Sequence, residues 1–174
     1  MNAGTLILIA MAAALLIGGG VMTYKISTAG EQYLPTIKAA AAQYNVPWEL
    51  LAAQLEQESG FDPNAVSGAG AQGIAQFMPS TAAQYGLTNP FDPSASIYAE
   101  AHLMSDLHNE FGSWLAALAA YNAGSGNVSA AISAANANND GANWLNYLPT
   151  SPSNQAQTQN YVAVISQNSG LTLT

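Results

Sequence analysis

Cysteine and arginine are both absent from this chain of 174 residues. Without cysteine there is no disulfide, no thiolate metal site and no cysteine nucleophile. Lys25 and Lys38 are the only basic side chains against ten acidic ones, and the formal net charge is −8. A chain so poor in positive charge cannot neutralise phosphates, so we expect no nucleic-acid partner. It also lacks the basic cluster that would hold it on an anionic membrane surface by charge alone.

Charged residues make up only 7 % of the chain, while 49 % are hydrophobic. A ligand must therefore be held by neutral hydrogen bonds and by shape. His102 and His108 lie six residues apart, which misses the i, i+4 pairing of a helical zinc motif, and we interpret both as structural or surface residues. The glycine- and lysine-containing phosphate loop is missing too. The sequence thus predicts no metal and no cofactor.

The chain begins with an apolar run, residues 5–22, that carries no charge. As a helix this run would be roughly 27 Å long, close to the hydrocarbon thickness of a bilayer. No positive side chain precedes it and no small-x-small cleavage site follows it, which argues against a cleaved signal peptide. We therefore predict a transmembrane anchor over residues 1–24 and a short polar tether over 25–30. Lys25 alone is a weak indication of a cytoplasmic domain under the positive-inside rule.

Residues 31–174 carry helical patterns throughout and no convincing alternating strand. The sequence therefore predicts one compact, mainly α domain. Pro47 suits the first turn of a helix over 46–60, and Gly60 suits its end. Further helices are expected over residues 31–45, 78–86, 93–112, 113–124, 127–136 and 153–167, with a polar, asparagine-rich loop over 135–143.

One carboxylate is out of place on the helix expected over 46–60. Leu51, Leu55 and Glu58 follow at i, i+4 and i+7 and share the apolar face, whereas Glu49 and Glu56 lie on the solvated side. Burial and the negative end of the helix dipole both disfavour the charged form of Glu58. A carboxylic acid that keeps its proton near neutral pH can protonate a leaving oxygen. The plainer alternative is that Glu58 only caps a helix end.

Small residues and neutral polar side chains follow in "SGAGAQGIAQFMP", residues 67–79. Glycine lets backbone approach a ligand closely, the Gln76 amide can donate and accept, and the Met78 thioether is deformable. Sugar recognition requires this mixture of neutral hydrogen bonds and apolar contact. In "AAYNAG", Tyr121 and Asn122 again place neutral polar side chains beside small residues, here at a helix end. A glycine-rich surface loop and a core tyrosine are the plainer readings of these two segments.

Two motifs carry a family resemblance. "QESGFDPNAVSGAGAQGIAQFMPSTA" and "AALAAYNAG" resemble the first and second signatures of lytic transglycosylases of the soluble-lytic type, whose fold is similar to goose-type lysozyme. The resemblance covers roughly residues 33–165, and the first motif is long enough to be specific. It implies a lysozyme-like helical domain.

The resemblance also implies an activity. Such enzymes cleave the β-1,4 bond between N-acetylmuramic acid and N-acetylglucosamine in peptidoglycan without water, and the muramoyl 6-hydroxyl closes a 1,6-anhydro ring. One carboxyl can then suffice where ordinary glycosidases use two. The family's catalytic acid falls on Glu58. The positions of the family's residues beside this acid or along the sugar cleft fall on Ser67, Gln76, Met78, Tyr121 and Asn122.

One family feature is altered. Members often carry a third signature that resembles Glu-Thr-Arg-x-Tyr-Val, and this chain reads "QTQNYV". Gln157 and Gln159 replace the glutamate and the arginine, while Tyr161 and Val162 remain. The change puts an assisting role of that glutamate in doubt and leaves the central acid untouched.

Three alternatives stay open at this stage. A hydrolytic lysozyme would need a second carboxylate, and Asp62 is the only acid nearby in sequence. A non-catalytic glycan-binding module would tolerate the loss of Glu58. A structural membrane protein of a virion would need only the anchor. The expected location is a virion membrane or a bacterial inner membrane, with the domain facing the cell wall and with virion or envelope proteins as further partners.

Overall fold

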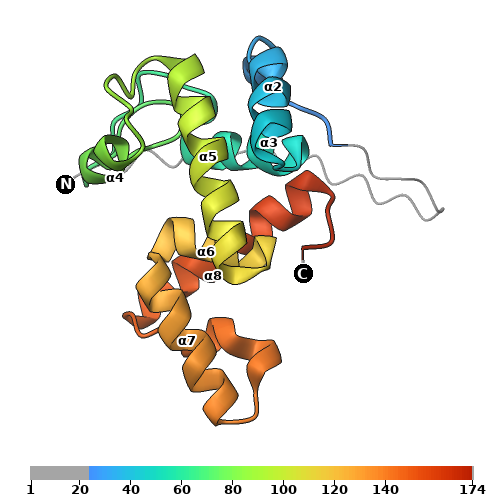
Figure 1. Cartoon of the computed structure of the whole chain (residues 1–174), viewed down its shortest axis with the longest axis vertical. Coiled ribbons are helices and arrows are strands. Elements are labelled where there is room, and N and C mark those ends of the chain that lie inside the picture. The colour runs from blue at the N-terminus through green and yellow to red at the C-terminus, as the bar shows by residue number, and fades with distance from the viewer. Residues whose placement is uncertain (1–23, 174) are drawn as a thin grey trace, which may run out of the picture.

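The computed structural model describes residues 24–173, and the predicted membrane span over residues 5–22 lies outside them. Within the described part, no helix is long and apolar enough to cross a membrane. The regular elements of this part are all helices, which confirms the mainly α prediction (Figure 1). They are α1 (Thr28–Glu31), α2 (Leu34–Tyr44), α3 (Trp48–Ser59), α4 (Pro79–Gln84), α5 (Pro93–Phe111), α6 (Trp114–Ala123), α7 (Ser125–Ala137), the 3-10 helix η1 (Gly141–Tyr147) and α8 (Pro152–Ser169).

Helix ends follow the local chemistry of the sequence. Gly60 has φ 63° and ends α3, a left-handed conformation that glycine adopts without steric cost. The Asp92 side chain accepts a hydrogen bond from the Ala95 N–H and caps α5. Pro47 precedes α3 as its N-cap rather than standing in the first turn. The loop expected over 135–143 is wrong in part, because α7 continues to Ala137 and η1 begins at Gly141.

The central helix is α6, whose residues Ala116–Ala120 are all buried. A helix that is apolar all round belongs in a core, and alanine lets neighbouring helices approach closely. In this structure α6 packs against α5, α7 and α8. Helix α6 thereby joins helices α2–α5 to α8. These helices and the loop after α3 supply the side chains of the candidate site.

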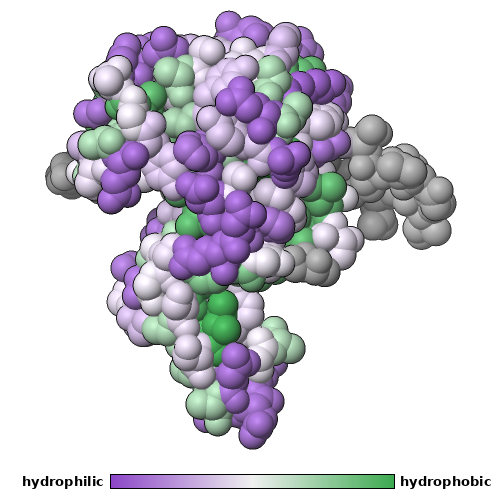
Figure 2. Space-filling model, in the orientation of Figure 1, coloured by the Kyte–Doolittle hydropathy of each residue, from purple (hydrophilic) through white to green (hydrophobic). Residues whose placement is uncertain are grey.

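The domain has two unequal parts (Figure 1). Helices α2 to α5 form the larger part, α5 descends toward α6 and α8, and α7 with η1 forms a projecting lobe at the other end. Hydrophilic residues cover much of the larger part, while strongly apolar patches lie near the narrow waist and on the α7–η1 lobe (Figure 2). On this face, the strongly apolar surface therefore lies mainly near the waist and on the α7–η1 lobe.

The first described residues pack onto the domain. The Tyr24 ring meets the edge of Trp48 at 5.8 Å between centroids, and its hydroxyl donates to Glu56 Oε2 at 3.2 Å. Ile26 is buried, and a Cβ on Gly30 would lie 2.6 Å from the Ile26 side chain. Residues 25–30, which the sequence suggests as a tether, thus include two buried positions against the helical body.

Candidate active site

Glu58 lies in the last turn of α3, at the edge of the core. Leu51 and Leu55, on the same helix face, are fully buried, and Glu58 itself is partly buried. The hydroxyl of Tyr161 on α8 donates to Glu58 Oε1 at 2.6 Å. Two helices distant in sequence therefore meet at this carboxyl.

The surroundings of Glu58 favour its protonated form. Burial raises the pKa of this carboxyl from 4.5 to about 7, and the hydrogen bond from Tyr161 opposes the rise because it stabilises the charged form. Near neutral pH both forms are therefore populated. Such a group can give up a proton and, once charged, is stabilised by a hydroxyl already in place.

The segment after α3 folds back along that helix. The Ser59 hydroxyl donates to the Ile74 carbonyl at 2.7 Å, which links the helix end to the segment. The backbones of Gln72 and Phe77 exchange two hydrogen bonds of 3.0 Å. Gly73 has φ 76°, and a Cβ there would lie 1.8 Å from the Pro90 carbonyl oxygen, so only glycine fits. The backbone of this segment is thereby held tightly and tied to the end of the helix that bears the acid.

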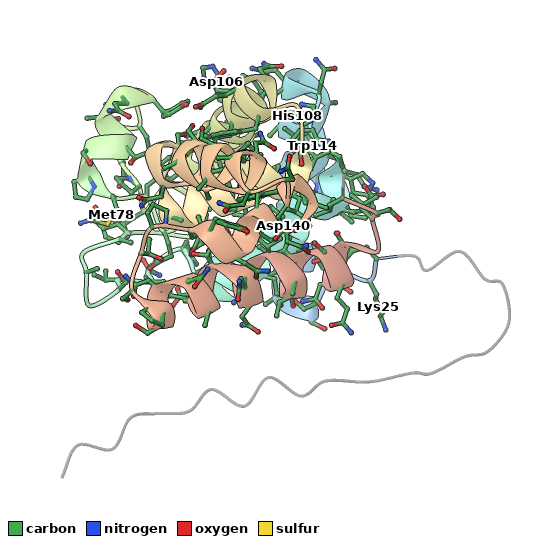
Figure 3. All side chains as sticks on the ribbon, turned by 90° about the horizontal axis from the view of Figure 1, so that it is seen from below. Lys25, Met78, Asp106, His108, Trp114 and Asp140 are labelled. Carbon is green, nitrogen blue, oxygen red and sulfur yellow. The ribbon has the colours of Figure 1, made fainter. Side chains whose placement is uncertain are left out.

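Three of the predicted residues lie in this segment. Gln76 has φ 49°, and its amide donates to the carbonyls of Gly73 at 2.9 Å and Ala65 at 3.2 Å, so it braces the loop. The Ser67 hydroxyl oxygen accepts a hydrogen bond from the Ala71 N–H at 3.0 Å, and the structure places no Ser67–Glu58 hydrogen bond among the described residues. Met78 is 42 % exposed and projects from the surface on the side away from Lys25 (Figure 3).

The other two predicted residues connect α6 to its neighbours. The Tyr121 hydroxyl donates to the Ala75 carbonyl at 2.6 Å, next to Gln76. The Asn122 amide oxygen accepts a hydrogen bond from the Thr158 hydroxyl of α8 at 2.8 Å. Tyr121 therefore braces the loop, and Asn122 ties α6 to the helix that carries Tyr161.

Two residues near Glu58 were not among the predicted site residues. Tyr161 stands in the retained part of the third signature, but no spacing along one helix predicts its contact with Glu58. Glu100 is fully buried on α5, and this burial, followed by the negative charge of Glu58, raises the pKa of its carboxyl well above its usual range. The sequence does contain a signal for Glu100, because it is an acid within an apolar helical stripe.

The altered third signature has a local role in the structure. Gln159 donates to the Leu145 carbonyl at 3.3 Å and to Asn146 Oδ1 at 3.0 Å, so it fastens α8 to η1. Gln157 is exposed. Neither side chain hydrogen-bonds to Glu58 in the described part of the protein.

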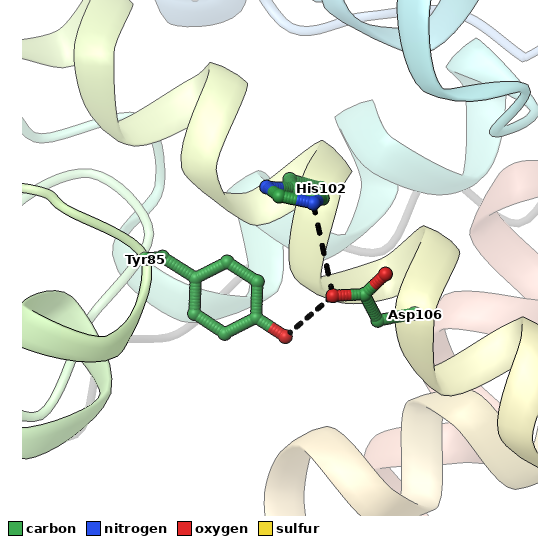
Figure 4. A network of polar contacts seen from close by, with 3 residues as sticks. All are labelled: Tyr85, His102 and Asp106. Carbon is green, nitrogen blue, oxygen red and sulfur yellow. Dashed lines mark hydrogen bonds and ion pairs between the residues drawn. The ribbon is translucent and has the colours of Figure 1, made fainter.

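The two histidines lie outside this site and pack as aromatic groups. His102 stacks on Tyr44 and lies 3.8 Å from Asp106, which also accepts a hydrogen bond from Tyr85 at 3.0 Å (Figure 4). His108 stacks on Trp114 at 3.9 Å between centroids. Within residues 24–173, no three histidine or acidic side chains lie together as a metal site would require. A separate cavity of about 190 Å³ lies beside His102, which is one of its lining residues. The others are Tyr44, Tyr85, Gly86, Leu87, Thr88, Ala95, Tyr98 and Ala99.

The candidate site thus consists of Glu58 at the end of α3, the Tyr161 hydroxyl from the last helix, and a tight loop that Ser59 ties to the same helix end. Residues 35–144 match the transglycosylase SLT domain, and the chain belongs to this family. The sequence-based recognition of the family is thereby confirmed.

Particular relatives share this domain. The chain is 42 % identical over 93 residues to the transglycosylase of Enterobacteria phage PRD1, covering 53 % of this chain and 35 % of the relative. It is 40 % identical over 116 residues to membrane-bound lytic murein transglycosylase D of Escherichia coli K12, covering 63 % and 25 %. An inactive variant of lytic transglycosylase Slt from Pseudomonas aeruginosa superimposes with a TM-score of 0.63 at 26 % identity, covering 78 % and 23 %. The chain thus spans about a third of the phage relative and a quarter of the bacterial ones.

Proposed function

We propose that this protein is a lytic transglycosylase that cleaves the bond between N-acetylmuramic acid and N-acetylglucosamine in peptidoglycan. The observation that carries the proposal is Glu58, whose pKa of about 7 and contact with Tyr161 suit a group that first donates and then accepts a proton. Membership of the SLT domain family supports the same activity.

The proposed reaction uses Glu58 twice. In its neutral form the carboxyl protonates the glycosidic oxygen, and the bond to the anomeric carbon breaks. The resulting carboxylate, with the Tyr161 hydroxyl still donating to it, then accepts the proton of the muramoyl 6-hydroxyl as that oxygen attacks the anomeric carbon. The product carries a 1,6-anhydro ring, and Glu58 regains its proton. Ser67, Gln76, Met78, Tyr121 and Asn122 are proposed to shape the sugar site around this acid.

Hydrolysis of the same bond is the alternative, and it needs a second carboxylate to direct water. Asp62 is exposed, and its Oδ1 accepts a hydrogen bond from the Asn64 N–H at 2.9 Å, as in a local turn. Glu100 is fully buried and cannot reach solvent. The burial of Glu100 and the local turn that occupies Asp62 support the reaction without water.

Product mass tests the proposed reaction. We expect that purified peptidoglycan digested with the full chain yields fragments one water lighter than the corresponding hydrolysis products, because the 6-hydroxyl replaces water as the nucleophile. Mass spectrometry of the released muropeptides measures this directly, with a hydrolytic muramidase digest as the reference. Fragments with ordinary reducing ends would assign the protein to the hydrolytic class, and no release of fragments would favour a glycan-binding module.

We further propose that residues 5–22 anchor the enzyme in a lipid bilayer, so that it opens the wall locally. The support is the uncharged run of 18 residues and its length as a helix. Two settings suit an anchored wall-cleaving domain: the membrane of a virion at entry, and the inner membrane of a bacterium during assembly of an envelope structure. Virion or envelope proteins are the corresponding partners.

Removal of residues 1–23 tests the anchor and spares Tyr24, which packs on Trp48. The full chain is expected to sediment with neutral lipid vesicles, and the shortened chain is expected to remain in the supernatant. A full-length Leu15→Asp variant provides a control of equal length, because a carboxylate at the centre of a span costs about 3 kcal/mol. Equal sedimentation of all three proteins would refute the anchor.

A further inference from the structure

Glu100 is an acid that the reaction above leaves unused. It lies on α5 within a buried stripe that includes Ile97 and Met104, and its exposure is 0 %. Neither of its carboxyl oxygens has a hydrogen-bond partner among the described residues. Gln54, one turn before Glu58 on α3, is equally buried, and its amide also lacks a partner there.

Such groups weaken a fold. A buried polar group without a hydrogen bond loses its hydration and gains nothing in return. An apolar side chain of similar volume at position 100 would therefore be the more stable choice. Residues that break the rules of core packing often serve a functional site at the expense of stability. Glu100 is such a residue. The titratable groups whose charges interact with it, Glu58, Tyr121 and Tyr161, belong to the candidate active site.

The titratable groups whose charges interact with Glu100 come from α3, α6 and α8, while the one cation on α2 points elsewhere. The negative charge of Glu58 on α3 acts on Glu100, and Glu100 acts in turn on Tyr121 of α6 and on Tyr161 of α8. From α2, Lys38 is exposed and rests over the Trp48 ring at 4.6 Å. Burial first and the charge of Glu58 second hold the pKa of Glu100 well above its usual range. Glu58 is the more exposed of the two acids and accepts the hydrogen bond of Tyr161, whereas Glu100 is fully buried and has no such donor among the described residues, so Glu58 is the one that ionises.

We propose that Glu100 is a positioning residue: its protonated carboxyl and the Gln54 amide, one turn before Glu58 on α3, are buried donors without a partner among the described residues, and they stabilise the negative charge that Glu58 acquires during the reaction. This inference rests on the proposed function of Glu58. A carboxylic acid kept neutral by its apolar site acts as a donor and not as a base. In this arrangement the two acids work as a pair that carries one negative charge at most.

Infrared or carbon-13 NMR titration of the carboxyl groups tests the pair without measuring activity. In the parent protein we expect one carboxyl to stay protonated above the pH at which Glu58 ionises, and we expect that signal to be missing from Glu100→Gln. In Glu58→Gln the same signal is expected to titrate at lower pH, because the charge that raised the pKa of Glu100 is gone. An unchanged Glu100 titration in Glu58→Gln would overturn the pairing.

Substitutions at position 100 test the effect on catalysis. Glu100→Leu is expected to raise the Tm by about 2–4 °C, to lower kcat roughly tenfold with KM within about twofold, and to shift the Glu58 titration upward. Glu100→Gln keeps a neutral donor and is expected to recover most of kcat. Met104→Leu, on the same buried stripe, serves as the packing control.

The outcomes of these measurements support or contradict the positioning role of Glu100. If Glu100→Leu keeps the parent's kcat and Glu58 titration, Glu100 has no positioning role. If Glu100→Gln loses as much kcat as Glu100→Leu, the donor explanation is wrong. Should Glu100→Leu fail to fold, the carboxyl titrations of the two glutamine variants decide alone. Hydrolytic products from the parent would refute the proposed reaction and leave the coupling of the two carboxyls measurable.

Discussion

Replacing Glu58 by glutamine is expected to reduce the release of anhydromuropeptides by roughly 10³-fold or more, because it removes the acid that we propose protonates the glycosidic oxygen. Glutamine has nearly the same shape and can still accept the hydrogen bond that Tyr161 donates to Glu58. Binding of glycan fragments is therefore expected to persist. The measurement is the rate of muropeptide release, together with the dissociation constant of a glycan oligomer.

The same variant has a predicted effect on stability. The pKa of Glu58 is raised by folding from 4.5 to about 7, so its contribution to the free energy of unfolding is present below pH 4.5 and is lost as the pH rises through about 7. Glu58→Gln removes this loss, and its advantage over the parent should grow across that range to about 2–3 kcal/mol. Chemical unfolding at several pH values measures it. A variant that is inactive and also less stable than the parent at pH 7 would indicate structural damage instead.

Replacing Tyr161 by phenylalanine is expected to have the second-largest effect. The hydroxyl donates to Glu58 Oε1 at 2.6 Å, and a hydrogen bond to a charged group contributes about 1.5–3 kcal/mol. Without it the carboxylate of Glu58 is less stable, so kcat should fall roughly 10- to 100-fold with little change in KM. The pKa of Glu58 should rise further above 7, and the alkaline limb of the pH–rate profile should move upward.

Tyr85→Phe provides the matched control. It removes another hydrogen bond from a tyrosine to a carboxylate, that of Tyr85 to Asp106 at 3.0 Å, away from Glu58 (Figure 4). Its kcat and pH profile are expected to resemble those of the parent. If Tyr161→Phe moves the alkaline limb downward, or if both variants lose activity equally, the role assigned to Tyr161 is wrong.

The helices could be predicted well from the sequence because their signals are local. Asn45, Gly60 and Gly112 each end a helix in the left-handed conformation, as a short polar residue and glycines at these positions indicate. The apolar period of α3 is local too, and by itself it predicts that Glu58 lies at the edge of the core, where the fold has it.

The surroundings of Glu58 could not be predicted in the same way. Tyr161 follows Glu58 by 103 residues, and only the packing of α8 against α3 brings the two together. Glu100 is the one acid in the otherwise apolar buried stripe of α5. Helical periodicity alone does not tell which other helix packs against that position. η1 was missed because the segment Gly141–Tyr147 has no sustained apolar period, and because its N-cap residue Asp140 stands in a stretch that reads as a polar loop and makes no side-chain capping hydrogen bond.

The contact of Tyr24 with Trp48 and Glu56 sets the point at which the chain joins the domain. That point is on α3, and Glu56 precedes the acid at the end of this helix by only two residues. A load applied to the preceding segment would therefore reach the domain first at α3, the helix that bears Glu58. In the proposed anchored enzyme, the end of α3 that bears Glu58 lies close to the point of attachment, and the length of chain before Tyr24 limits how far that end can move from the membrane.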